Sequence, residues 1–473
     1  MSVMIMTIKW RWAVSAVLLG VQPTIAMVAT YPRPDGIVGS EHYRVSVTQG
    51  GRTQPSFVYA VNAQWKSNRS KDTAWTTFSF DGRVTVQVTK LRGTFSRCRV
   101  LPSSRGITPQ ITGNSVCFDL DRPAKLAVEF DESIEHPLLI FADPPERDLP
   151  RRDDPNVVWF APGVHELAEP LEAKAGQTIY LAGGAYVKGR VTGRDASKVR
   201  VIGRGVLSGE NFPKGGAHLL HLRGWKTREA LIEGVTLINS PHFNIVAEGF
   251  QNTVRNVKMI GWWFSTDGVD AGGRGCVEDC FFKVNDDAIK LYFSGTSVRD
   301  CVIWQLENGA PFQISWNMPS DQHGLRVSDC DVIRVEHQWK NDNEAVFCAI
   351  HGGTARMNDY LFENIRIENA RWRLVSLVTK PNEFAPGVTQ PGSISNVTFR
   401  NITADGPFTL PSRLRGFNAQ SRIEAVTFNN VRVNGKFWSN AQDANIEIDP
   451  ATTSNVRFTP SADRAPQQER GRR

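Results

Sequence analysis

Apolar and polar residues alternate along short runs in the first third of the chain. The runs 57–61, 75–80, 84–88 and 126–130 are rich in Val, Phe, Thr and Tyr, and turn signals such as Asp81-Gly82 separate them. Period-two alternation at this spacing is typical of short strands in a two-sheet stack. We therefore predict an antiparallel β-sandwich over residues 30–144.

Further along, the pattern changes into an irregular repeat in which a polar or Gly corner is followed by alternating apolar residues. The corner residues of eight copies are spaced 21 to 37 residues apart, and they are Gly234, Asn256, Asp279, Asp300, Asp329, Asn364, Asn401 and Asn430. A period in the twenties with insertions indicates a solenoid. The β-branched alternation, without a sustained helical period, predicts a right-handed parallel β-helix over residues 157–455.

The repeat also predicts what its corners and its interior look like. Asn and Asp tolerate the left-handed backbone conformation and hydrogen-bond locally, so we place them at tight bends between strands. Cys280, Cys301 and Cys330 hold the same place in three successive units. We expect them to stack inside the solenoid as an apolar ladder.

Three segments fall outside these two regions. Residues 145–156 are charged and rich in Pro, which is typical of a linker. Residues 456–473 are rich in Arg, Gln and Pro and are predicted to be a disordered tail. In residues 1–29, Lys9 and Arg11 precede an apolar run that Gln22-Pro23 interrupts, which predicts a cleaved signal peptide and a secreted or periplasmic protein rather than an uncleaved anchor.

The formal charge of +7 on 473 residues changes little in this picture. Residues 1–29 and residues 461–473 each contribute +2, which leaves +3 for the body of the chain and gives a nucleic-acid-binding function little support. Seven cysteines are too few for a disulfide scaffold of this size, and their spacing resembles no zinc site. Cys98 and Cys117 flank a turn-rich stretch, so either a disulfide or two buried thiols fits them.

Three aspartates form the strongest candidate for chemistry. Asp267 lies 19 residues before Asp286 and 20 before Asp287, about one coil of the expected solenoid. Because successive coils are about 4.8 Å apart, these acids can share one site. Adjacent strand residues point to opposite faces, so the hypothesis requires a bend or bulge at 285–287. A protonated acid beside ionised carboxylates is the equipment that glycoside hydrolysis needs.

Other interpretations of these acids are turn formers and calcium ligands, since an all-oxygen cluster also suits that ion. Aromatic residues crowd the same coils, and aromatic faces stack on sugar rings. We predict Trp263, Tyr292 and Trp316 as substrate-binding residues, Gln313 as a partner for a sugar hydroxyl and Lys290 as a further binding residue that could bias a neighbouring acid. We expect no metal and no organic cofactor.

Three motifs around the acids carry a resemblance. The segments Trp263-Phe-Ser-Thr-Asp-Gly268, Asn285-Asp-Asp-Ala-Ile-Lys-Leu-Tyr292 and Glu307-Asn-Gly-Ala-Pro-Phe-Gln-Ile-Ser-Trp316 resemble the core of glycoside hydrolase family 49, the dextranases and isopullulanases. Residues 160–165 and 180–189 resemble the start of its β-helix, so the similarity extends from about Tyr31 to Gly435. Polygalacturonases are related, but their Gly-His-Gly coil and Arg-x-Lys element are missing from these motifs.

The resemblance implies an inverting, endo-dextranase-like or isopullulanase-like hydrolase of α-glucans. By motif position it makes Asp286 the general acid and lets Asp267 and Asp287 hold the attacking water. We expect a polysaccharide as the partner, with no nucleic acid, no membrane after signal removal, and a monomer. The alternatives are a polygalacturonase-like pectin hydrolase, a non-catalytic polysaccharide-binding β-helix and a polysaccharide lyase.

Overall fold

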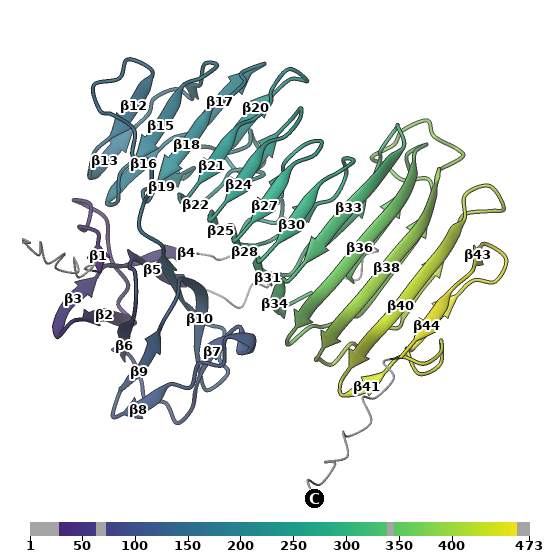
Figure 1. Cartoon of the computed structure of the whole chain (residues 1–473), viewed down its shortest axis with the longest axis horizontal. Coiled ribbons are helices and arrows are strands. Elements are labelled where there is room, and N and C mark those ends of the chain that lie inside the picture. Colours follow the sequence, from purple (N-terminus) through teal and green to yellow (C-terminus); the bar gives the residue numbers. More distant parts are fainter. Residues whose placement is uncertain (1–27, 63–71, 338–344, 461–473) are drawn as a thin grey trace, which may run out of the picture.

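The computed structural model describes residues 28–62, 72–337 and 345–460, and it is built almost entirely from β-strands. The predicted all-β fold, a β-sandwich followed by a right-handed parallel β-helix, is confirmed (Figure 1). The sandwich packs along the solenoid well beyond its first coils, since Asp143 pairs with Lys258 and Glu129 pairs with Arg334. The predicted signal peptide lies largely outside the described residues.

The sandwich consists of a six-stranded and a five-stranded sheet, with one short helix, η1 (Ser103–Arg105), between β7 and β8. Its strands are β1 (Ala29–Thr30), β2 (Tyr43–Gln49), β3 (Arg52–Ser56), β4 (Val58–Asn62), β5 (Asp72–Ser79), β6 (Val84–Lys90), β7 (Cys98–Leu101), β8 (Gln110–Thr112), β9 (Ser115–Leu120), β10 (Ala124–Phe130) and β11 (Leu138–Asp143). All pairs are antiparallel except β5 and β11, which run parallel. That pair departs from the purely antiparallel expectation.

The β-helix begins with β12 (Val157–Phe160), after the expected linker. One wall is an 11-stranded parallel sheet formed by β14 (Leu171–Glu172), β17 (Val191–Arg194), β20 (Leu220–Arg223), β23 (Ile245–Ala247), β26 (Val269–Asp270), β29 (Ile289–Lys290), β32 (Phe312–Ser315), β35 (Ala345–His351), β37 (Arg373–Thr379), β39 (Ser412–Arg415) and β42 (Ile446–Ile448). Strands of successive coils lie side by side in chain order, as a solenoid requires.

The rest of each coil belongs to a 22-stranded sheet. Its strands are β12 (Val157–Phe160), β13 (Gly163–Glu166), β15 (Thr178–Leu181), β16 (Ala185–Lys188), β18 (Arg200–Gly203), β19 (Val206–Ser208), β21 (Leu231–Glu233), β22 (Thr236–Ile238), β24 (Thr253–Arg255), β25 (Lys258–Ile260), β27 (Cys276–Glu278), β28 (Phe281–Val284), β30 (Ser297–Arg299), β31 (Val302–Gln305), β33 (Gln322–Ser328), β34 (Asp331–Val335), β36 (Arg356–Ile367), β38 (Ser393–Ala404), β40 (Ile423–Val433), β41 (Lys436–Phe437), β43 (Thr453–Ser454) and β44 (Arg457–Thr459).

The predicted bends lie at the corner residues of the repeat. All eight have a positive φ between 51° and 81°, from Asp279 at 51° to Gly234 at 81°. The last coils also form a side-chain ladder, in which Asn364 donates to Asp329, Asn401 to Asn364, and Asn430 to Asn401, over 2.8 to 3.1 Å. These bends turn each coil toward its next strand.

The interior of the solenoid is apolar. Cys280, Cys301 and Cys330 are each fully buried within it, as the ladder prediction requires. Farther along, Phe362, Phe399 and Phe428 stack with ring centroids 5.2 Å apart. Cys98 and Cys117 are free thiols, so the structure contains two cysteines there and no disulfide.

Two expected boundaries need correction. Val28 is buried in the sandwich core and Ala29 pairs with Ser79, so the folded sandwich begins before residue 30. At the other end, β44 pairs with β40, so the ordered coils continue beyond residue 455. In that strand Phe458 stacks on Phe428 at 5.1 Å, which explains why a segment of tail-like composition is ordered there.

Candidate active site

The three aspartates lie at the same corner of two successive coils. Asp267 lies between β25 and β26, and Asp286 and Asp287 lie between β28 and β29, where the backbone bends out of the strand conformation. Gly268 N donates to the Asp287 carbonyl at 2.9 Å, which stacks the two corners directly. One carboxylate oxygen from each acid lies within 4.8 Å of the others. The bend that the sequence hypothesis required is therefore present, and it brings the three acids together.

Amide side chains hold this corner. Asn285 donates to the Trp262 carbonyl at 2.9 Å and accepts from Asn308 N at 3.0 Å. Asn308 in turn donates to Asp286 Oδ2 at 2.9 Å, and Gln305 donates to the Asp286 carbonyl at 2.8 Å. Because these amides are buried or nearly so, their hydrogen bonds define the direction of the Asp286 side chain.

Gly309 allows the next coil to approach the acids closely. Its φ is +79°, and a Cβ there would lie 2.2 Å from the Asp286 carbonyl carbon and 2.3 Å from Asp287 N. No L side chain fits at these distances, so the coil must move away from the Asp286–Asp287 peptide if a methyl group is added. The close packing of this corner depends on glycine.

We expect Gly309→Ala to lower kcat/KM by about 100-fold, because a shift of about 1 Å in a catalytic group has that order of effect. The measurement is hydrolysis of the best substrate found for the wild-type chain. Gly176→Ala is the matched control, since Gly176 has a φ of +72° but open space around its Cβ position. Equal activity losses in both variants would mean that backbone strain alone, and not the contact with the acids, is responsible.

Lys290 lies between two of the acids. Its Nζ is 2.7 Å from both Asp267 Oδ2 and Asp287 Oδ2. Asp287 also accepts hydrogen bonds from Trp316 Nε1 at 3.2 Å and from Ala310 N at 3.1 Å. Burial lowers the pKa of Lys290, but the charges of Asp267 and Asp287 outweigh burial and raise it above its usual value. Lys290 is therefore a cation at neutral pH, and its charge favours the ionised form of Asp267.

The surroundings of Asp286 favour its protonated form. Burial first, and then the negative charges of Asp267 and Asp287, raise its pKa well above the ordinary value. Burial also raises the pKa of Asp267, to about 7, although Lys290 opposes that shift. Asp286 is thus the acid that the site keeps protonated, because the charge of Lys290 is directed at its neighbours.

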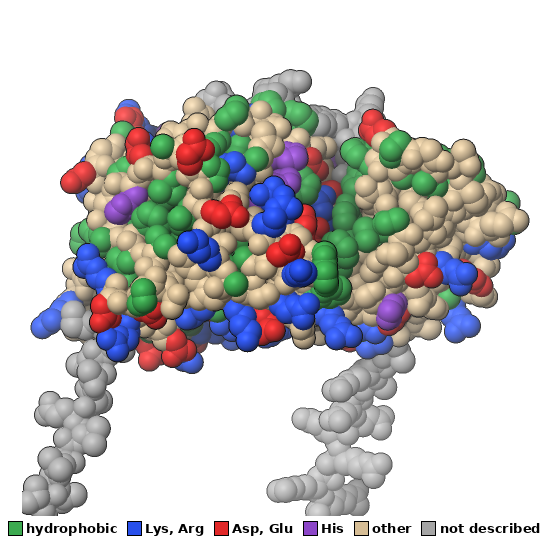
Figure 2. Space-filling view, turned by 90° about the horizontal axis from the view of Figure 1, so that it is seen from above, with side chains coloured by type: hydrophobic (Ala, Val, Ile, Leu, Met, Phe, Trp, Pro, Cys, Tyr) green, Lys and Arg blue, Asp and Glu red, His purple; other side chains and the backbone are tan. Residues whose placement is uncertain are grey.

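These acids lie in a cleft of about 880 Å³ that extends over several coils. A hollow is visible near the middle of the molecule in the space-filling view (Figure 2). The aromatic residues that line the cleft are Phe243, Phe264, Tyr292, Trp316 and Phe384. Trp316 and Phe384 meet edge to face at 4.8 Å, so they form one aromatic wall.

Three of the five predicted binding residues line the cleft and two do not. Tyr292, Trp316 and Lys290 line it, although Lys290 is only 7% exposed and its charge is directed to the acids rather than to a substrate. The prediction for Gln313 is wrong: it is fully buried, and its register partner Cys348 belongs to a small apolar cluster that Trp316 packs against. Gln313 is therefore buried beside this cluster in the sheet and is not among the residues that line the cleft.

Trp263 is not among the residues that line the cleft, so its prediction as a stacking residue is not supported by the geometry. Its ring packs against Phe264 at 4.7 Å, and Phe264 lines the cleft instead. The Trp263 carbonyl accepts hydrogen bonds from Thr266 N and Oγ1, at 2.9 and 2.6 Å. Its main contribution is therefore to the turn that presents Asp267.

Several residues of the cleft were missed from the sequence. They are His242, Phe243, Asp270, Asn308 and the segment 380–384. Asn308 lies in a quoted motif, and Asp270 follows Asp267 by three residues, so both carried a local signal. The segment 380–384 carried no local signal in the sequence. Its position in the cleft depends on Asn382, which belongs to a later coil and donates to the Trp316 and Ile350 carbonyls.

A calcium ion fits this corner poorly. The three acids form one of two groups among the described residues whose oxygen or nitrogen atoms could surround an ion. However, the ammonium group of Lys290 already lies 2.7 Å from two of the three carboxylates. A divalent cation would have to displace a buried positive charge, which makes acid–base chemistry the better match for this donor set.

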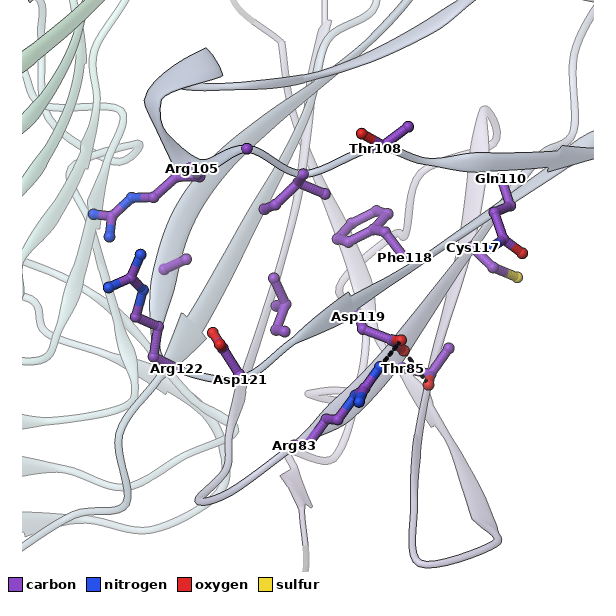
Figure 3. Close-up of a pocket in the computed structure, with 14 residues that line it drawn as sticks. Arg83, Thr85, Arg105, Thr108, Gln110, Cys117, Phe118, Asp119, Asp121 and Arg122 are labelled. Carbon is purple, nitrogen blue, oxygen red and sulfur yellow. Dashed lines mark hydrogen bonds and ion pairs between the residues drawn. The ribbon is translucent and has the colours of Figure 1, made fainter. Parts of the chain in front are cut away.

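A pocket in the sandwich, of about 510 Å³, offers different chemistry (Figure 3). Its Asp119 accepts from Thr85 Oγ1 and from Arg83, both at 2.6 Å. These two hydrogen bonds lower the pKa of Asp119. A carboxylate held in its ionised form cannot serve as a proton donor, so the acid cluster of the cleft remains the candidate active site.

Comparison with known proteins agrees with this geometry. The chain is 26% identical over 313 residues to a dextranase of Arthrobacter globiformis, a match that covers 60% of this chain and 45% of the dextranase. It is 24% identical over 450 residues to the isopullulanase of Aspergillus niger, covering 80% and 75% of the two chains. The chain thus spans less than half the length of the Arthrobacter dextranase.

The fold is that of a solved enzyme structure. Dex49A from Penicillium minioluteum superposes with a TM-score of 0.74 over 91% of this chain and 96% of its own, at 18% identity. No protein-family model matches the chain, and among its described residues no helix is long and apolar enough to cross a membrane. As its motifs predict, the chain resembles the dextranases and isopullulanases of glycoside hydrolase family 49.

Proposed function

We propose that the chain is an inverting glycoside hydrolase that cleaves α-glucans of the dextran or pullulan type. The observation that carries this proposal is the division of labour among three adjacent acids. Asp286 has a strongly raised pKa, whereas Asp267 and Asp287 share the Lys290 ammonium. One proton donor beside two carboxylates is the set that hydrolysis with an activated water needs.

In this mechanism Asp286 donates its proton to the glycosidic oxygen as the bond between that oxygen and the anomeric carbon breaks. A water held by Asp267 and Asp287 attacks the anomeric carbon, and one of the two carboxylates takes the proton that the water loses. The Lys290 ammonium lies 2.7 Å from both carboxylates and opposes the rise that burial produces in the pKa of Asp267. The proton lost by Asp286 and the proton gained by the pair balance over one turnover.

We infer the stereochemical outcome from the way in which Asp267 and Asp287 act together on one water, and not from the distance between the carboxyl groups. Inverting glycosidases commonly hold their two carboxyl groups about 6.5–9.5 Å apart, whereas the oxygens here lie within 4.8 Å of one another. Two neighbouring carboxylates can accept both hydrogens of one water, which leaves the water oxygen to attack. A covalent intermediate between the sugar and the enzyme would need only one of these two carboxylates. We therefore propose inversion.

The charge of the cleft favours a neutral glucan over a pectin. Asp267, Asp270, Asp286, Asp287 and Glu383 line it, against Lys290 and Lys380. Since Lys290 is engaged by two of the acids, little positive charge remains for a polyuronate. The names of the curated relatives, dextranase and isopullulanase, point to the same class of substrate.

The test is a reducing-sugar screen over dextran, pullulan, nigeran and polygalacturonate, followed by NMR of the first product. We expect new reducing ends with dextran or pullulan, and a product of inverted anomeric configuration. A product with retained configuration would reject the water mechanism. Binding to glucans without any new reducing ends would favour the non-catalytic alternative, and an unsaturated product from polygalacturonate would indicate a lyase.

A further inference from the structure

A second groove lies at the turns that lead from the 11-stranded sheet into the 22-stranded sheet. It has a volume of about 510 Å³ and shares no lining residue with the cleft of the acids. Its lining residues come from four successive turns and from the start of β33: Arg228, Phe250, Gln251, Arg274, Ser294, Gly295, His323 and Gly324. A groove that follows the coils in this way suits an extended polymer.

Close backbone packing shapes the groove. Arg228, Phe250 and Gly273 are linked by parallel bridges, so these turns stack in register. A Cβ on Gly273 would lie 2.7 Å from the Phe250 ring, and a Cβ on Gly295 would lie 3.0 Å from Arg274 Cγ. The Phe250 ring and the Arg274 side chain therefore each lie over a glycine of the next turn, and both remain at the surface.

Phe250 is an exposed aromatic ring in this groove, with 49% of its surface accessible. In the preceding turn Trp225 is 68% exposed. Exposed aromatic rings on a rigid backbone offer a flat apolar face to the CH groups of a sugar ring. Phe250 thus provides a stacking surface for one sugar unit.

The polar groups of the groove are mainly donors. Its lining includes Arg228, Arg274 and His323 but no Asp or Glu. Both arginines are exposed, and neither forms an ion pair with a described residue. Guanidinium groups bind carboxylates in a two-pronged hydrogen-bonded pair, so the groove is complementary to a ligand rich in negatively charged oxygens.

We propose that this groove binds an acidic polysaccharide, with carboxylates on Arg228 and Arg274 and a sugar face on Phe250. The two arginines are two coils apart, about 10 Å at about 4.8 Å per coil, so they contact different units of one chain. The site is independent of the acid cluster, and the proposal does not depend on the hydrolase activity. Its role would be to hold the protein on an acidic matrix while the cleft remains free.

The experiment measures binding of the full-length chain to polygalacturonate and to dextran at low and moderate salt. We expect polygalacturonate to bind, and Arg228→Ala/Arg274→Ala to weaken that binding at least tenfold. The wild-type affinity should fall as salt rises, because salt screens exposed charges. Phe250→Ala should weaken binding at low salt without changing its salt dependence. Asp286→Asn should bind polygalacturonate like the wild-type chain.

The matched control is Arg105→Ala/Arg122→Ala, which removes the same charge from the sandwich pocket of Figure 3. If this control weakens binding as much as the groove variant does, the attraction comes from net charge and the proposal fails. Unchanged binding in Arg228→Ala/Arg274→Ala would also overturn it, as would dextran binding in the groove as tightly as polygalacturonate. Because both groove arginines are exposed, these variants are expected to fold, and circular dichroism checks this.

Discussion

Asp286→Asn is expected to lower kcat about 10²- to 10⁴-fold while the chain remains folded, because general-acid catalysis contributes about that much. The substituted amide occupies nearly the same volume but cannot give a proton to the leaving oxygen. The loss should appear in kcat more than in KM, since the proton is transferred only during the reaction. Single-turnover hydrolysis of the best glucan from the screen measures it.

The matched control is Asp270→Asn. Asp270 lines the same cleft, and burial raises its pKa to about 6, yet it lies outside the cluster of three acids. We expect this variant to retain activity within about tenfold of the wild-type value. Near-normal activity of Asp286→Asn, or an equal loss in both variants, would remove Asp286 from the role of proton donor.

The acid cluster was predictable from the sequence because it depends on period alone. In a solenoid, a residue and its counterpart one coil later are neighbours whatever the rest of the fold does. The spacing of 20 residues between Asp267 and Asp287 therefore carried three-dimensional information. The positive φ values at the corners, such as 53° at Asn256 and 56° at Asp300, were predictable for a related reason, since few residue types tolerate that conformation.

The lining of the cleft was less predictable because it depends on what covers each side chain. Gln313 alternates in β32 with the core residues Phe312 and Ile314, yet its own side chain is also fully buried. Phe384 belongs to a coil more than 60 residues after Trp316, and only the folded chain shows that the two rings meet. Periodicity gives the direction of a side chain, whereas its exposure is decided by loops whose course the sequence does not reveal.

Lys290→Met is expected to have the second large effect, on both the pH dependence and the stability of the chain. Lys290 lowers the pKa of Asp267 against the effect of burial. Without the ammonium group that pKa rises, so Asp267 becomes protonated at a higher pH than before. The acidic limb of the kcat/KM profile, which requires ionised Asp267, should then move to higher pH. Activity at neutral pH should fall accordingly.

The stability of the variant should also fall, by about 3–5 kcal/mol at a pH where the carboxylates are ionised, because two buried charges lose their counter-ion. Because the pKa of Asp267 in the folded chain lies above its ordinary value, stability is lost as pH rises, and more is lost in the variant, where that pKa is higher; the deficit relative to the wild-type chain should therefore shrink in acid. Lys290→Arg keeps the charge and should leave the acidic limb in place, even if the larger group reduces kcat.

Lys258→Met separates the effect on stability from the effect on the pH dependence of activity. Lys258 Nζ lies 2.7 Å from Asp143 Oδ2, and both side chains are fully buried where the sandwich meets the β-helix. Losing this pair should cost stability on the same scale, about 3–5 kcal/mol, but should leave the pH profile of the surviving activity unchanged. If the acidic limb stays in place in Lys290→Met, or moves equally in Lys258→Met, then Lys290 does not act through the ionisation of Asp267, and its role is confined to holding the corner together.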